Sequence, residues 1–180
     1  MVCRLALFAL LLAASAWLPG TVGAATDIGP SAFDGIAWGT TLANLERSMG
    51  PADSRQSGDI RFFRRLDKEY RPAGLQPVPT VYAFYQDALH GVYIQPQTQQ
   101  AAESMLTSLR LEYGDGERWT RFGVSYVQWR LGRLTVTHKA DSNTGKYRIA
   151  FIHLPPHVAV KDTEQFIESL NNPASGRGYW

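Results

Sequence analysis

The sequence predicts an α+β domain in which an antiparallel sheet carries helices on one face. Three observations lead to this prediction. Two segments, 40–50 and 98–114, have apolar residues at helical spacing and end in glycine. Each is followed by short runs of β-branched and aromatic residues separated by turns. The two halves also align with each other, which predicts two tandem helix-strand-strand-strand units, followed by a short C-terminal helix.

Residues 1–25 have the composition of a secretory signal peptide. Arg4 supplies a positive charge, residues 5–17 are apolar apart from Ser15, and small residues precede a predicted cleavage after Ala24 or Ala25. The apolar run is shorter than the roughly 20 residues that a membrane helix needs. We therefore expect an exported protein, periplasmic or otherwise secreted, with no membrane span after cleavage.

The mature chain should form one α+β domain over residues 26–172, with a flexible tail over 173–180. The sole cysteine, Cys3, lies in the predicted signal peptide, so stability must come from a packed core rather than from disulfides. Because Arg4 is also removed, the mature net charge is about +1. A nearly balanced charge gives no strong field over the surface, so we expect no nucleic-acid partner.

The first half, residues 33–95, begins with a short strand that contains Ile36 and Trp38. Thr40 or Thr41 can cap a helix whose apolar face contains Leu42 and Leu45 and which Gly50-Pro51 would end. Strands are predicted at 59–65 and, after a proline-rich loop, in a hairpin over 81–94.

The second half, residues 98–155, begins with a longer helix that ends at Gly114. Four of its residues align with the first helix at one offset of 64: Leu106, Leu109, Tyr113 and Gly114 match Leu42, Leu45, Met49 and Gly50. A shared offset indicates an internal duplication, although two ordinary amphipathic helices could also coincide. Strands follow at 124–130, 133–139 and 146–154, and a last helix is predicted over 162–170. If Lys139 pairs with Lys146 in the second hairpin, His138 shares a face with Tyr147.

The first hairpin carries the candidate binding surface. If Gln86 pairs with Leu89, then Tyr82, Phe84 and Tyr93 share one face, in the place where the second half has mostly polar residues. An aromatic patch at that place is a candidate for an interaction site. The alternative is that another part of the chain covers these side chains and makes them core.

Other motifs point to weaker candidates. Arg61, Arg64 and Arg65 lie in a basic and aromatic stretch that could bind an anionic glycan or lipid headgroup, although acidic residues dilute it. The histidines do not have the spacing of a metal site, and the chain has no phosphate loop, dinucleotide glycine pattern or Gly-x-Ser-x-Gly elbow. We therefore expect no cofactor and no bound metal.

The stretch Phe33, Gly35, Ile36, Trp38, Gly39, Thr40 with its leucine helix resembles a pattern that recurs in uncharacterised exported bacterial proteins. There the pattern opens a helix-plus-sheet unit, which implies a periplasmic α+β protein without a known activity. Tandem helix-then-sheet units also resemble the architecture of β-lactamase inhibitor protein. Those units usually begin with a helix pair, whereas this sequence shows a single helix in each half. Such a likeness concerns the fold and does not give the function.

These observations predict a non-catalytic periplasmic protein. It would bind an envelope protein or a small ligand through Tyr82, Phe84 and Tyr93, with Arg61 and Arg65 as further candidates. The alternative is a small periplasmic hydrolase whose site is assembled in space around His90, His138 or His153.

Overall fold

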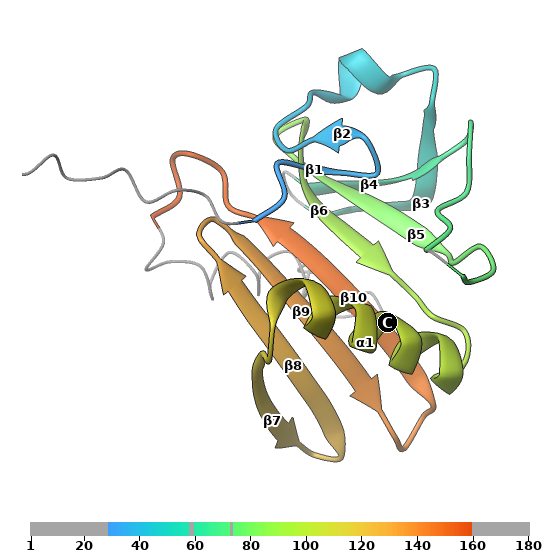
Figure 1. The fold of residues 1–180 in the computed structure, drawn as a ribbon. Helices are drawn as coiled ribbons and strands as arrows, with labels where there is room; N and C mark the ends of the chain where they lie inside the picture. The colour runs from blue at the N-terminus through green and yellow to red at the C-terminus, as the bar shows by residue number, and fades with distance from the viewer. Residues whose placement is uncertain (1–28, 58–59, 73, 160–180) are drawn as a thin grey trace, which may run out of the picture.

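The computed structural model describes residues 29–57, 60–72 and 74–159, which form a large antiparallel sheet with one α-helix on one of its faces (Figure 1). The sheet has eight strands in the order β3-β4-β5-β6-β10-β9-β8-β7. Their bounds are β3 (Met49–Ser57), β4 (Ile60–Arg65), β5 (Thr80–Tyr85), β6 (Ala88–Ile94), β7 (Glu117–Arg121), β8 (Val124–Leu131), β9 (Leu134–Asp141) and β10 (Lys146–His153).

The strands form two meanders of four. β3 to β6 make the first and β7 to β10 the second, and β6 pairs antiparallel with β10 to join them into one sheet. The α+β class and the antiparallel sheet are confirmed. The prediction of three strands in each half is wrong, because β3 and β7 were not recognised in the sequence.

The helix α1 (Gln99–Tyr113) agrees with the prediction for 98–114. The Thr98 hydroxyl accepts a hydrogen bond from the Ala101 backbone N–H (3.2 Å), which satisfies one donor of the first turn. At the other end Gly114 has a φ of 78°, and its N–H donates to the Arg110 carbonyl (2.9 Å). Both ends are therefore where capping chemistry predicts them.

The helix predicted over 40–50 is wrong. Only a single 3-10 turn, η1 (Leu42–Leu45), forms there, and the described residues contain one α-helix rather than two. The reason is tertiary: from Met49 onward the chain pairs with β4, Met49 with Arg65 and Gly50 with Arg64, so it is a strand where the helix would have continued. The Gly39 and Leu42 N–H groups donate to the carbonyls of Leu89 and Asp87 in the β5–β6 hairpin (both 2.8 Å), which fixes the start of η1 against that hairpin.

Gly50-Pro51 does not end a helix but lies inside β3. Gly50 pairs with Arg64 of β4, and Pro51 pairs with Phe63. Proline is tolerated in this strand because β3 is at the edge of the sheet. Only one side of the strand forms hydrogen bonds to a neighbouring strand, so the backbone N–H that proline lacks is not needed on the other side. The correspondence of Gly50 with Gly114 is therefore one of sequence and not of conformation.

The sheet has a hydrophobic cluster on each face. On the face that α1 covers, together with η1 and the small hairpin β1 (Ala32–Phe33) and β2 (Ile36–Ala37), the cluster contains Phe33, Met105, Leu109, Val136 and Phe151 among others (Figure 1). The second cluster, on the opposite face, contains Ile60, Phe62, Ala83, Tyr93, Ala150, Ile152 and Leu154. The predicted signal peptide (1–25), C-terminal helix (162–170) and tail (173–180) lie outside the described residues.

Candidate functional site

A row of short side chains crosses the sheet at the end where β7, β8 and β9 lie under α1. The strand register places Thr120 of β7 opposite Ser125 of β8, and Ser125 opposite Ala140 of β9. Tyr147 of β10 is the next residue in this row. Because three small neighbours cannot fill the space beneath a helix, the chain leaves a cavity of about 580 Å³ there.

The neighbouring row completes the floor of the cavity with larger side chains. Arg118 of β7 pairs with Val127 of β8, and Val127 pairs with His138 of β9. Both rows lie on the same face of the sheet, since residues two apart in a strand point to the same side. The floor is therefore shallow at His138 and deeper at Ala140.

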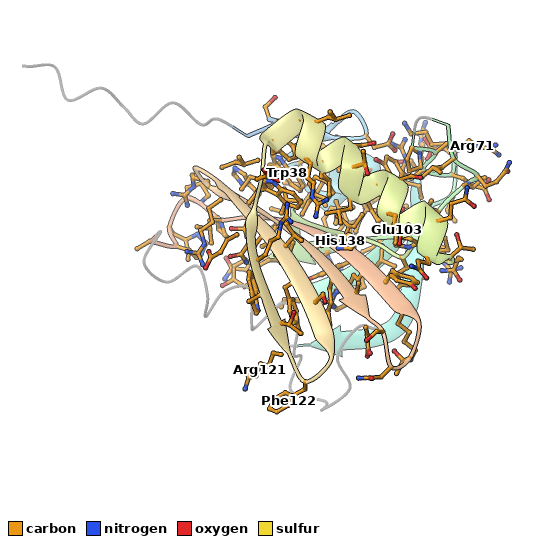
Figure 2. All side chains as sticks on the ribbon, turned by 60° about the horizontal axis from the view of Figure 1, so that its bottom comes forward. Trp38, Arg71, Glu103, Arg121, Phe122 and His138 are labelled. Atoms are coloured by element: carbon orange, nitrogen blue, oxygen red, sulfur yellow. The ribbon has the colours of Figure 1, made fainter. Side chains whose placement is uncertain are left out.

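One face of α1 forms the roof. Its lining residues recur at helical spacing: Gln99, Ala102, Glu103, Leu106 and Arg110. Ala102 and Leu106 are apolar, whereas Glu103 and Arg110 put opposite charges near the two ends of the roof. Figure 2 shows Glu103 on the helix and His138 beneath it. The cavity thus has an apolar middle and polar ends, as is common in ligand sites.

Two polar groups of this cavity are buried and have no hydrogen-bond partner among the described residues. They are Nε2 of His138, a residue that is only 4% exposed, and Nε of Arg110. In native proteins most buried polar groups are hydrogen-bonded, so a buried group of this kind in a cavity lining is a position where a ligand can form a hydrogen bond. Both exceptions lie in the lining of the same cavity.

Burial lowers the pKa of His138 to about 4. Removal from water disfavours the charged imidazolium, the nearby Arg110 lowers the pKa further, and the Ala102 backbone partly opposes the shift. His138 is therefore neutral at neutral pH. The other basic residues of the lining are Arg110 and Arg118, and Arg118 already pairs with Asp115 (2.7 Å).

The aromatic residues predicted to form a binding face are buried. Tyr82 is 1% exposed, and Phe84 and Tyr93 are each 0% exposed. They also do not share one face: Tyr82 pairs with Val92 and Val81 with Tyr93, one residue away from the predicted pairing. The prediction of a common face is wrong, and the three side chains belong to the core.

A register shift in β6 explains this error. Ala83 pairs with Gly91 but Phe84 pairs with Leu89, which leaves His90 as an extra residue. A one-residue slip moves a strand's side chains to the opposite face. Tyr93 therefore packs with Phe62 (ring centroids 6.3 Å apart) in the second cluster, while Tyr82 and Phe84 lie in the cluster under α1, β1 and β2.

Arg61 and Arg65 lie on β4, far along the sheet order from the cavity, and both already have acidic partners. Arg61 forms an ion pair with Asp87, and Arg65 pairs with Asp34 (3.2 Å) and with Asp67. Arg64 donates to the Ala52 carbonyl (3.0 Å). An anionic ligand at this stretch would have to compete with these carboxylates.

The structure places His138 apart from the other two histidines of the hydrolase alternative, His90 and His153. The His90 and His153 rings stack with centroids 6.3 Å apart, and Nδ1 of His90 lies 2.9 Å from the His153 carbonyl oxygen. Neither lines the cavity that contains His138. In the described ranges, no cluster of three or more His, Cys, Asp and Glu residues could hold a metal ion.

Sequence reasoning placed His138 and Tyr147 on one face but missed the cavity. The predicted pairing of Lys139 with Lys146 is two residues away from the observed pairing with Arg148, so the faces are unchanged. The missed signal was side-chain size: Ser125 and Ala140 are small at the places where the strand pattern expects bulky residues. Arg110 was missed because it lies on a helix face that looked solvent-exposed in the sequence.

Among the described residues, no helix combines the length and the apolar character needed to span a bilayer. Comparison of this chain with family models, with curated proteins and with solved structures finds no match.

Proposed function

We propose that this protein is a non-catalytic binding protein of the periplasm that takes a small, largely apolar ligand into the cavity between α1 and strands β7 to β9. The observation that carries the proposal is a cavity of about 580 Å³ whose lining contains two buried polar groups with no partner in the described part of the chain. Ligand sites in proteins are typically concave, mostly apolar and supplied with a few convergent polar groups. The periplasmic location follows from the signal peptide predicted in the sequence.

A small ligand suits this site better than a protein partner. A protein interface needs roughly 800 Å² from each partner, whereas the cavity is a local hollow under one helix. The aromatic residues that favoured an interface in the sequence are core, so they offer no surface to a partner. The hydrolase alternative needs a nucleophile hydrogen-bonded to a histidine, and no such pair with His138 occurs among the described residues.

The test uses N-phenyl-1-naphthylamine, a neutral dye that fluoresces in apolar surroundings. In the Ala140→Phe variant the new ring should occupy the deep part of the cavity. We expect the wild-type protein to bind one dye molecule saturably and the variant to bind it at least about tenfold more weakly, because the aromatic side chain replaces the space that the dye uses.

Ala43→Phe is the matched control, because Ala43 is exposed on η1 and does not line the cavity. This variant should bind the dye like the wild type. Thermal unfolding of each variant checks that it is folded, and Ala140→Leu replaces Ala140→Phe if the larger side chain prevents folding. Wild-type protein that binds no dye, or a folded Ala140→Phe variant that binds as tightly as wild type, would contradict the proposal.

A further inference from the structure

The guanidinium of Arg110 stands out in the charge arrangement of the cavity. The other charged residues of the lining already have partners: Glu103 accepts a hydrogen bond from the Gln99 side-chain amide (2.7 Å), and Arg118 pairs with Asp115 (2.7 Å). For Arg110, the described part of the chain shows no ion pair or side-chain hydrogen bond, and its Nε is shielded from solvent. Its positive charge thus has no partner among the described residues.

An arginine in this position is suited to bind an anion. Its planar fork of N–H groups matches the oxygens of a carboxylate or a phosphate, and charge-assisted hydrogen bonds are stronger than neutral ones. A partly desolvated cation without a counter-ion is unfavourable, so an anionic ligand group would recover part of that cost. His138 does not compete for the anion, since burial keeps its imidazole neutral.

The acidic residue of the cavity does not oppose this assignment. Glu103 and Arg110 are seven residues apart on α1, which separates their backbones by roughly 10 Å along the helix axis. Repulsion between Glu103 and an anion at Arg110 is therefore weak at physiological salt. The surface between them includes apolar side chains, Ala102 and Leu106 above and Val127 and Ala140 below.

We propose that the cavity is specific for amphiphilic anions: Arg110 binds a carboxylate or phosphate head, and an apolar tail lies along Ala102, Leu106, Val127 and Ala140. This inference rests on the proposed function, because it names the ligand class of the same cavity. Arg110 is the specificity-determining residue. The apolar side chains of the cavity bind the tail, and their contribution to affinity does not depend on the head group.

The test measures how well three ten-carbon compounds displace N-phenyl-1-naphthylamine below their micelle-forming concentrations. The compounds are decanoate, decyl phosphate and 1-decanol, which share the tail and differ in the head. We expect at least one of the anions to bind about tenfold or more tightly than decanol, because only an anion forms charge-assisted hydrogen bonds with Arg110. The stronger of the two anions identifies the head as carboxylate or phosphate.

Arg110→Met removes the charge and keeps most of the apolar stem, so it should abolish the preference for the anion and leave decanol binding unchanged. Arg121→Met is the matched control, because Arg121 lies on β7 outside the cavity lining, near the hairpin tip (Figure 2). It makes the same change in net charge and should keep the wild-type preference. Arg110→Gln takes the place of Arg110→Met if the methionine variant does not fold.

The outcomes separate this inference from the proposed function. If decanol binds wild type as tightly as both anions, or if Arg110→Met keeps the anion preference, the anion assignment is overturned. The proposed cavity function still stands in that case, provided that Ala140→Phe blocks the dye. If Ala140→Phe does not block the dye, the proposed function fails and the inference fails with it.

Discussion

His138 shows how a single buried side chain links stability to pH in this protein. The ring lies in the floor of the cavity, faces Arg110 and Glu103 of α1, and is neutral because its pKa is lowered to about 4. In the unfolded chain the same group has its ordinary pKa of about 6.5. Between these two values the unfolded state binds a proton that the folded state does not.

This difference predicts that acid destabilises the protein through His138. Above about pH 6.5 His138 is neutral in both the folded and the unfolded state, so the free energy of unfolding keeps its full value. As the pH falls towards 4, protonation of His138 in the unfolded chain lowers the free energy of unfolding, by about 3 kcal/mol in total. His138→Gln cannot titrate, so its free energy of unfolding should fall less over the same range. Urea denaturation of both proteins at pH 7, 5.5 and 4 measures the difference, and parallel loss of stability in the two proteins would contradict the prediction.

At the scale of the element, two glycines with the same sequence context have different conformations. Gly114 ends α1 with a φ of 78°, which other residues rarely adopt, whereas Gly50 has no positive φ and pairs within β3. A Cβ added at Gly114 would meet nothing within 4 Å, so backbone strain alone would set its cost. A Cβ at Gly50 would lie 2.9 Å from Cδ2 of Leu66, an exposed side chain that can rotate away.

We therefore expect substitution by alanine to destabilise the protein at Gly114 and to have little effect at Gly50. Gly114→Ala should lower the free energy of unfolding by about 1 kcal/mol, because alanine is strained at positive φ. Gly50→Ala should change it by less than about 0.5 kcal/mol. Urea denaturation of the two variants checks this, and an equal loss of about 1 kcal/mol at both positions would restore the interpretation of Gly50 as a helix end.

At the scale of the whole molecule, the described residues form one sheet from two meanders, and α1 lies over it with the proposed binding cavity beneath. The helix covers the second meander, while β1, β2 and η1 lie over the first (Figure 1). The two halves thus bury the same face of the sheet by different means. Only the half that has the α-helix forms the proposed binding site.

The proposed function also requires export, which the first 25 residues predict. We expect the protein expressed from its full-length gene to be found in the envelope fraction, with a mature chain that begins at Ala25 or Thr26, because small residues precede a signal-peptide cleavage site. Cell fractionation with intact-mass measurement checks the location and the new N-terminus. A chain that keeps residues 1–24 and stays in the cytoplasm would contradict the periplasmic proposal.

By itself, the sequence determined the α+β class, both ends of α1, and the face of β9 that carries His138, since capping and side-chain alternation depend on near neighbours in the chain. The tertiary structure decided the rest. Pairing of the chain from Met49 onward with β4 prevented the first helix, and the extra residue His90 moved Tyr93 to the opposite face from Tyr82. The cavity depends on side-chain volumes from five separate elements, α1 and β7 to β10, that meet only in the fold, so no local pattern could have revealed it.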